Sequence, residues 1–462
     1  MMILLLLLLL CWISDASPVA TASIDAKLVL RDSAARGGGI GFKAIHVAAP
    51  QFRVKANPSP SSAAQKSLFP YSAHIFQQHT KNPAALRSST TTLGRKFGEY
   101  YTSIKLGSPG QEAILIVDTG SELTWLKCLP CKVCAPSVDT IYDAARSVSY
   151  KPVTCNNSQL CSNSSQGTYA YCARGSQCQF AAFYGDGSFS YGSLSTDTLI
   201  METVVGGKPV TVQDFAFGCA QGDLELVPTG ASGILGLNAG KMALPMQLGQ
   251  RFGWKFSHCF PDRSSHLNST GVVFFGNAEL PHEQVQYTSV ALTNSELQRK
   301  FYHVALKGVS INSHELVLLP RGSVVILDSG SSFSSFVRPF HSQLREAFLK
   351  HRPPSLKHLE GDSFGDLGTC FKVSNDDIDE LHRTLPSLSL VFEDGVTIGI
   401  PSIGVLLPVA RYQNHVKMCF AFEDGGPNPV NVIGNYQQQN LWVEYDIQRS
   451  RVGFARASCV ID

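Results

Sequence analysis

Short apolar runs separated by glycine, proline, asparagine and serine dominate the chain from about residue 97 onward. They read EYYTSIKLG, AILIV, VVFFG, FYHVALKGVSI, SVVILD, LSLVF and LWVEYDI. Runs of this length and composition are typical of β-strands. Helical spacing is rare, and the best candidate covers residues 338–350, where Phe340, Leu344 and Phe348 recur every fourth position after Pro339. The pattern predicts an all-β-dominated body with few short helices.

The two halves of this body repeat one motif. Residues 114–126, ILIVDTGSELTWL, and residues 324–336, VVILDSGSSFSSF, each run from four apolar residues into an aspartate that is followed by a hydroxyl residue, a glycine and a second hydroxyl residue. The motif residues are Asp118, Thr119, Gly120 and Ser121 in the first copy and Asp328, Ser329, Gly330 and Ser331 in the second. Downstream, ILG at 234–236 is matched by VIG at 432–434. Such a repeat predicts two duplicated β lobes, each presenting one carboxylate.

The residue types of the repeat suit acid–base chemistry. Two carboxylates held close together cannot easily both ionise, so they share one proton, and one member can accept a proton while the other donates one. A single Asp-Thr-Gly is usually an ordinary turn, but two matched copies favour a functional pair. A carboxylate-pair glycosidase would not need twin loops across duplicated halves. We therefore expect Asp118 and Asp328 to be catalytic, in a cleft between the lobes.

The front of the chain differs from the body. The run MMILLLLLLLCWI predicts a secretory signal peptide over residues 1–22 and is too short to favour a membrane span. Residues 23–95 lack clear periodicity and predict a propeptide or linker rather than a packed domain. We expect the N-terminal lobe over residues 96–285, with a Cys-rich insertion at 128–178, and the C-terminal lobe over residues 286–462.

Charge separates the front from the body as well. Residues 1–96 hold eleven Lys and Arg against three acidic residues, which leaves 27 basic and 33 acidic residues in the remainder. The basic residues are scattered, so we expect no nucleic-acid partner. A basic propeptide on an acidic body should hold near neutral pH and be released as carboxylates become protonated. The propeptide is thus a predicted inhibitor of the body.

Cysteine usage agrees with export. Cys11 lies in the predicted signal peptide, and the twelve cysteines after it predict six disulfides. These are Cys128, Cys131, Cys134, Cys155, Cys161, Cys172, Cys178, Cys219, Cys259, Cys370, Cys419 and Cys459. CLPCKVC lacks the fourth cysteine of a ferredoxin-type site and the thirteen histidines form no HExxH motif, so we expect no metal and no cofactor. Asn156, Asn163 and Asn268 lie in N-x-Ser/Thr sequons and are predicted glycosylation sites.

Residues from about 97 to the C-terminus resemble the two-lobed, pepsin-like aspartic proteases, whose carboxylate dyad is a known example of pKa tuning. FYGDGS at 183–188 resembles the flap of that family, which implies a substrate-binding role for Tyr184, Gly185 and Asp186. Trp125 matches the tryptophan that the flap tyrosine contacts. The resemblance further implies that Thr119 and Ser329 brace the two active-site loops against each other, and that Ser121 and Ser331 bond the outer carboxylate oxygens.

The cysteine pattern is similar to that of the nepenthesin-like plant branch, which carries a Cys-rich insertion between the first aspartate and the flap. The pairing implied by that branch is Cys128 with Cys131, Cys134 with Cys219, Cys155 with Cys178, Cys161 with Cys172, Cys259 with Cys459, and Cys370 with Cys419. Sequence alone does not set this connectivity.

These features predict an acid endopeptidase that hydrolyses peptide bonds with two aspartates and an activated water. The alternative is an inactive homologue that binds another secreted enzyme, as some plant members inhibit glycanases. Those members typically lose an aspartate motif or the flap tyrosine, whereas Asp118, Asp328 and Tyr184 are all present. We expect polypeptide substrates, a monomer without a membrane anchor, and secretion to the extracellular, apoplastic space, with the vacuole as the other candidate compartment.

Overall fold

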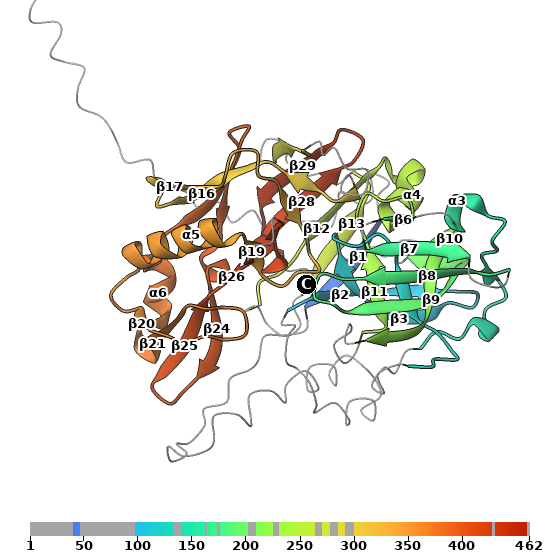
Figure 1. The fold of residues 1–462 in the computed structure, drawn as a ribbon, viewed down its shortest axis with the longest axis horizontal. Helices are drawn as coiled ribbons and strands as arrows, with labels where there is room; N and C mark the ends of the chain where they lie inside the picture. The colour runs from blue at the N-terminus through green and yellow to red at the C-terminus, as the bar shows by residue number, and fades with distance from the viewer. Residues whose placement is uncertain are drawn as a thin grey trace, which may run out of the picture.

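Two β-rich lobes lie on either side of a shared central sheet in the computed structural model (Figure 1). The structure describes residues 40–46, 98–133, 141–161, 164–165, 167–172, 176–201, 209–224, 231–263, 270–277, 285–291, 300–426 and 430–459. The predicted signal peptide, Cys134, Asn163 and Asn268 lie outside these residues. The all-β, bilobal architecture predicted from the apolar runs is confirmed.

The first half of the chain supplies most of the large sheet. Its strands are β1 (Ile40–His46), β2 (Tyr100–Leu106), β3 (Gln111–Asp118), β4 (Trp125–Lys127), β5 (Lys151–Pro152), β6 (Ser164–Ser165), β7 (Thr168–Cys172), β8 (Cys178–Phe183), β9 (Phe189–Met201), β10 (Val210–Leu224), β11 (Gly233–Gly236), β12 (Lys255–Cys259) and β13 (Thr270–Phe275). Among the described residues the sheet runs in the order β14-β29-β28-β12-β13-β1-β2-β3-β11-β4-β10-β9-β8-β7-β6, with β5 paired to β9. Strands β14, β28 and β29 come from the second half, so the sheet joins the two halves of the chain.

The second half builds three smaller sheets. Its strands are β14 (Gln286–Ser289), β15 (His303–Val304), β16 (Leu306–Ile311), β17 (Glu315–Leu318), β18 (Val325–Leu327), β19 (Ser334–Phe336), β20 (Lys357–Leu359), β21 (Cys370–Ser374), β22 (Leu388–Phe392), β23 (Thr397–Ile400), β24 (Leu406–Arg411), β25 (His415–Phe420), β26 (Phe422–Asp424), β27 (Asn431–Ile433), β28 (Leu441–Asp446) and β29 (Arg451–Arg456). The sheets have the orders β15-β18-β27-β19-β26, β17-β16-β22-β23 and β20-β21-β25-β24.

Helices are few and short in the described part of the chain. They are α3 (Ser158–Cys161), α4 (Leu244–Phe252), α5 (Arg338–His351) and α6 (Ile378–Thr384), with 3₁₀ turns η2 (Ala144–Arg146), η5 (Asn375–Asp377), η6 (Ser402–Gly404) and η7 (Asn435–Gln438). The helix predicted at 338–350 is α5, and it buries Phe340, Leu344 and Phe348 as their spacing requires. None of the helices described is long and apolar enough to span a membrane.

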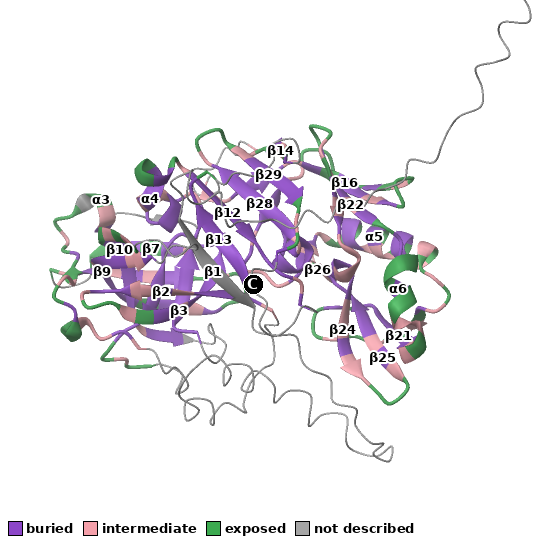
Figure 2. Ribbon diagram, turned by 180° about the vertical axis from the view of Figure 1, so that it is seen from behind, coloured by how far each residue is buried: buried purple, intermediate pink, exposed green. Residues whose placement is uncertain are grey.

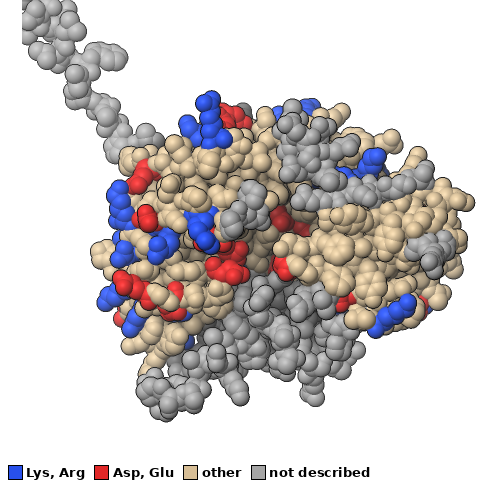
Figure 3. All heavy atoms as spheres, in the orientation of Figure 1, with Lys and Arg blue, Asp and Glu red and all other residues tan. Residues whose placement is uncertain are grey.

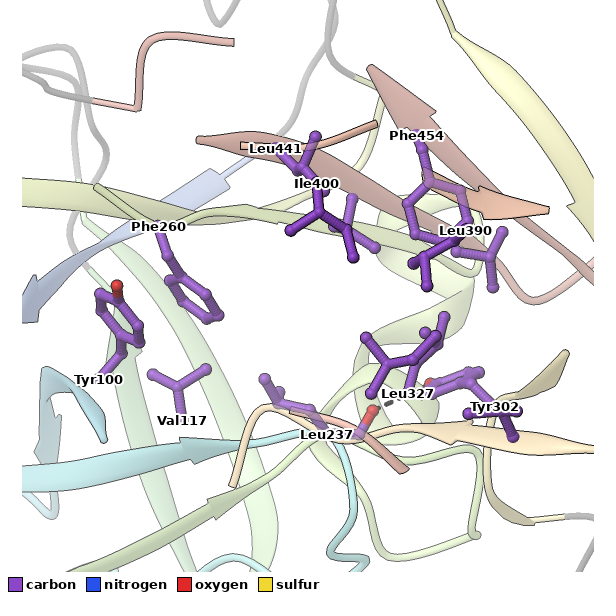
Figure 4. Close-up of a cluster of buried hydrophobic side chains, with 14 of the residues drawn as sticks. Tyr100, Val117, Leu237, Phe260, Tyr302, Leu327, Leu390, Ile400, Leu441 and Phe454 are labelled. Carbon is purple, nitrogen blue, oxygen red and sulfur yellow. Dashed lines mark hydrogen bonds between the residues drawn. The ribbon is translucent and has the colours of Figure 1, made fainter. Parts of the chain in front are cut away.

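A continuous apolar core extends from one lobe to the other beneath the central sheet. Figure 2 shows that burial is concentrated in the strands, whereas exposed residues lie in the connecting loops and on α6. Val117 and Leu327, which precede the two motif aspartates, both belong to this core (Figure 4). The hydroxyl of Tyr302 donates to the carbonyl oxygen of Leu237 at 2.9 Å and so joins the halves (Figure 4). The core thus holds the two lobes together next to the Asp118 and Asp328 loops.

One strand comes from the segment that we predicted to be a propeptide or linker. Strand β1 pairs antiparallel with β13 on one side and with β2 on the other. Part of the 23–95 segment is therefore built into the central sheet, because β13 and β2 leave a strand position between them. The assignment of this segment as a propeptide, and the lobe boundary at 285/286, stay predictions.

Candidate active site

Each motif aspartate lies at the end of a strand that is flanked by the later apolar-Gly strand of its own half. In the first half, β11 pairs parallel with β3, so that Gly236 lies beside Asp118, and antiparallel with β4. In the second half, β27 pairs parallel with β18 and antiparallel with β19. The ILG and VIG runs are therefore the strands that hold the two aspartate loops in place.

Glycine is required where the loops and strands approach closely. A Cβ on Gly236 would lie 2.4 Å from the Glu122 carbonyl oxygen, and one on Gly434 would lie 2.4 Å from the Phe333 carbonyl. Across the lobes, a Cβ on Gly120 would lie 2.6 Å from Asp328 Oδ1, and one on Gly330 would lie 2.4 Å from Asp118 Oδ1. Each carboxylate is thus packed against the backbone of the opposite loop, which only glycine permits.

The two loops are tied together by a symmetric set of hydrogen bonds. The backbone N–H of Thr119 donates to Ser329 Oγ at 3.0 Å, and that of Ser329 donates to Thr119 Oγ1 at 2.9 Å. Thr119 Oγ1 donates to the carbonyl oxygen of Leu327 at 3.0 Å, and Ser329 Oγ donates to that of Val117 at 2.7 Å. The cross-brace inferred from the family resemblance is present, and Thr119 and Ser329 make equivalent hydrogen bonds in it.

The carboxylates receive matching hydrogen bonds. The backbone N–H of Gly120 donates to Asp118 Oδ1 at 2.8 Å, and that of Gly330 donates to Asp328 Oδ1 at 2.9 Å. Ser121 Oγ donates to Asp118 Oδ2, and Ser331 Oγ donates to Asp328 Oδ2 at 2.7 Å. Burial, followed by the negative charge of Asp328, raises the pKa of Asp118 to about 8. The pair therefore retains a proton at acidic and neutral pH.

The predicted flap residues form the turn between β8 and β9. The indole Nε1–H of Trp125 donates to the hydroxyl of Tyr184 at 2.7 Å, and the Trp125 side chain is fully buried. The pKa of Tyr184 is raised, first by burial and second by the nearby carboxylate of Asp118. Gly185 and Asp186 are exposed at the tip, where Asp186 accepts from the backbone N–H of Ser188 at 3.1 Å. Tyr184 and Trp125 are thus brought to the first aspartate, and the tip faces solvent.

Disulfide formation is confirmed, but part of the implied pairing was wrong. The structure pairs Cys128 with Cys219, Cys155 with Cys172, Cys161 with Cys178, Cys259 with Cys459 and Cys370 with Cys419. Cys128 directly follows β4, whose parallel pairing with β10 brings the Cα of Cys128 to 5.4 Å from that of Cys219. This excludes Cys128–Cys131 and Cys134–Cys219; Cys131 is disulfide-bonded.

The other two errors fall in the insertion. Sγ of Cys161 lies 3.3 Å from Sγ of Cys172, although each bonds elsewhere. The sulfur atoms of Cys155, Cys161 and Cys172 lie within 4.8 Å of one another, as metal ligands would, but the disulfides occupy all three. Sequence spacing cannot choose partners in so compact a cluster. Of the sequon residues, Asn156 is described and exposed, as a glycosylation site requires.

Sequence reasoning missed several residues that hold the loops. Asn435, which directly follows the VIG run, donates from Nδ2 to the Ser329 carbonyl oxygen at 3.0 Å. Lys300 Nζ donates to the buried carboxylate of Glu122 at 3.1 Å, an ion pair between the two halves. Arg263 donates to Asn435 Oδ1 at 2.9 Å. The polar residue after the VIG run was a usable signal for Asn435, whereas nothing local marks Arg263 or Lys300.

Fold and site together define a pepsin-like aspartic protease architecture, with one Asp-hydroxyl-Gly loop from each lobe. Residues 100–277 match the family model described as xylanase inhibitor N-terminal, and residues 301–456 match the one described as xylanase inhibitor C-terminal. Aspartyl protease family protein 2 of Arabidopsis thaliana is 35% identical over 392 residues, which cover 82% of this chain and 75% of that protein. The chain belongs to the pepsin-like aspartic protease family.

Three further proteins are similar to the chain. Aspartic proteinase nepenthesin-1 of Nepenthes gracilis is 28% identical over 371 residues, 78% of each protein. The crystal structure of basic 7S globulin from soybean matches with a TM-score of 0.61 at 21% identity, over 77% of this chain and 91% of that one. The structure titled edgp matches with a TM-score of 0.62 at 21% identity, over 91% and 95%. These structural matches bear on the fold alone.

Proposed function

We propose that the protein is a secreted acid endopeptidase that hydrolyses peptide bonds with the Asp118–Asp328 pair. The observation that carries this proposal is the matched support of the two carboxylates. Each receives one backbone N–H and one serine hydroxyl, and each lies against the glycine of the opposite loop. An inactive binding protein has no need for such matched support at both aspartates.

The proton inventory of the pair fits general acid–base catalysis. The ionised member accepts a proton from a water held between the carboxylates, and the water oxygen attacks the peptide carbonyl carbon. The protonated member of the pair donates its proton to the carbonyl oxygen. The tetrahedral intermediate then collapses when the carboxyl that took the water proton donates it to the amide nitrogen and the C–N bond breaks. The other carboxylate recovers its proton from the hydroxyl whose oxygen becomes the carbonyl oxygen of the new carboxyl group. Both carboxylates end the cycle able to share one proton again.

Charge supports a role for the basic propeptide as an inhibitor. On the face that Figure 3 shows, Asp and Glu side chains lie near the junction of the two lobes, and others are intermingled with Lys and Arg over the C-terminal lobe. A basic segment is attracted to such a surface while its carboxylates are ionised. We propose that the chain is made as a monomeric zymogen and acts on exported polypeptides.

The proposal is tested by measuring cleavage of a denatured protein substrate against pH, with and without pepstatin. We expect acid-active, pepstatin-sensitive cleavage, and we expect Asp118→Asn to lose roughly 10²–10⁴-fold because it removes one of the two carboxyl groups that transfer protons. Asp214→Asn is the matched control, since Asp214 is exposed and pairs with the exposed Lys151. Retained cleavage in Asp118→Asn would refute the mechanism.

A second candidate function is inhibition of a secreted glycanase, which the descriptions of the matching family models favour. The same preparation distinguishes the two. A processed, disulfide-bonded chain that cleaves nothing at any pH, yet lowers the rate of a xylanase, would replace the protease proposal. A chain that cleaves substrate and leaves the xylanase rate unchanged would exclude the inhibitor.

A further inference from the structure

A buried arginine lies between the start of the body and the second aspartate loop. Arg263 follows β12 in the loop that leaves the central sheet, and only 9% of it is exposed. Its Nη2 donates to the Gly98 carbonyl oxygen at 2.6 Å and to Asn435 Oδ1 at 2.9 Å. The guanidinium carbon lies 4.7 Å from the centre of the Tyr436 ring. Arg263 is thus fixed by two acceptors and an aromatic face.

Arg263 sets the orientation of the Asn435 side-chain amide, which holds the Asp328 loop. A guanidinium can only donate, so it turns the oxygen of Asn435 toward itself and the NH₂ group toward the loop. That NH₂ group donates to the Ser329 carbonyl oxygen at 3.0 Å. The backbone N–H of Asn435 donates to the Ser331 carbonyl oxygen at 2.8 Å. Ser331 in turn bonds Asp328. The guanidinium therefore acts on Asp328 through two intervening residues.

The other end of the contact is the first described residue of the body. Gly98 has a φ of +89°, and a Cβ there would lie 1.8 Å from the Arg263 guanidinium. Tyr100 reinforces this docking, because its hydroxyl donates to the Pro261 carbonyl oxygen at 2.6 Å and its ring stacks on Phe260 at 4.1 Å (Figure 4). The chain leaving the predicted 23–95 segment is therefore held against the loop that carries Arg263.

We propose that Arg263 is a positioning residue that couples the docking of Gly98 to the geometry of the Asp328 loop. The pair of aspartates is then fully aligned only while the start of the body is in place. Processing that cuts before Gly98 preserves the alignment, whereas trimming beyond Gly98 removes the acceptor and loosens the loop. This inference rests on the proposed protease function for its kinetic consequence, but the coupling itself is a property of the fold.

The test compares Arg263→Met and Arg263→Lys with Arg251→Met in the full chain. Arg251 is exposed in the last turn of α4 and donates to the Thr211 carbonyl oxygen, so its loss controls for removal of an arginine. Methionine fills the space without a donor, and lysine keeps the charge but lacks the planar guanidinium that lies over the Tyr436 ring. We expect Arg263→Met to lower kcat roughly ten- to a hundredfold with little change in KM, because a small misplacement of a reacting group is that costly.

A second readout does not depend on catalysis. Hydrogen–deuterium exchange should accelerate in Arg263→Met within peptides covering 98–104 and 325–336 and stay unchanged elsewhere, whereas Arg251→Met should leave both peptides unchanged. Guanidinium added to Arg263→Ala should restore part of kcat. Faster exchange throughout the chain would assign Arg263 a merely structural role and overturn the proposal, as would unchanged exchange at 325–336. A wild type that cleaves nothing while these exchange changes occur would refute the protease function and leave the coupling standing.

Discussion

A buried histidine in the central sheet should make the protein steeply less stable in acid. His258 on β12 is fully buried, its ring stacks on Phe260 with centroids 4.1 Å apart, and its Nε2 lies 3.4 Å from the Tyr445 hydroxyl. Burial lowers the pKa of His258 to about 3, against 6.5 in an exposed histidine. Below pH 6.5 the unfolded chain therefore binds a proton at His258 that the folded chain does not bind until about pH 3.

The size of the effect follows from linkage. Stability is fully present above pH 6.5 and falls by about 1.4 kcal/mol for each pH unit below it until the folded group titrates. At pH 4 the difference is 2.5 units, which corresponds to a loss of about 3 kcal/mol from this one residue. That is a large share of the stability of a typical domain.

The perturbation is His258→Phe, which keeps a ring of similar size on Phe260 and removes the titrating group. Urea unfolding followed by tryptophan fluorescence at pH 7, 6, 5 and 4 gives the free energy of unfolding of variant and parent. Both carry Asp118→Asn to prevent self-digestion. The difference in free energy of unfolding between variant and parent should shift by about 3 kcal/mol in favour of the variant between pH 7 and pH 4.

The control is His314→Gln, since His314 is exposed on the β16–β17 hairpin. This control should follow the parent at every pH. Parallel stability curves for His258→Phe and its parent would refute the reasoning, because they would mean that the folded protein protonates His258 as readily as the unfolded chain does.

Three further predictions concern the flap, the dyad and the front segment. Trp125→Phe removes the hydrogen-bond donor to Tyr184, and because such a bond is worth about 1 kcal/mol we expect kcat/KM to fall about fivefold. Adding Tyr184→Phe should cause no further loss of kcat/KM. A double variant whose loss equals the sum of the two single losses, in free-energy terms, would contradict this. Ser121→Ala removes a hydrogen bond that lowers the pKa of Asp118. The alkaline limb of the pH–rate profile should therefore move about one pH unit higher. An alkaline limb that does not move would contradict this role of Ser121. At about pH 4, mass spectrometry should show loss of the 23–95 segment, which neutral buffer preserves; an intact segment in acid would refute release by charge.

Much of the fold and the dyad could be predicted from the sequence because their determinants are local. An apolar run with turn residues at its end specifies a strand and its exit whatever the rest of the chain does. The repeat of such a run before Asp118 and Asp328 therefore predicted two lobes, whereas the way in which the hydroxyls brace the two loops was implied by the family resemblance. The spacing of Phe340, Leu344 and Phe348 located α5 to within one residue.

Contacts between distant segments were decided only by the tertiary structure. Cys128 pairs with Cys219 rather than Cys131 because parallel pairing of β4 and β10 brings their backbones together. Strand β1 finds its place between β13 and β2, although its segment shows no periodicity. Arg263 reaches Asn435 across 172 positions of the chain. The sequence by itself determined the strands, the repeat and the candidate carboxylates, whereas partner choice depended on distances that only packing of the two lobes creates.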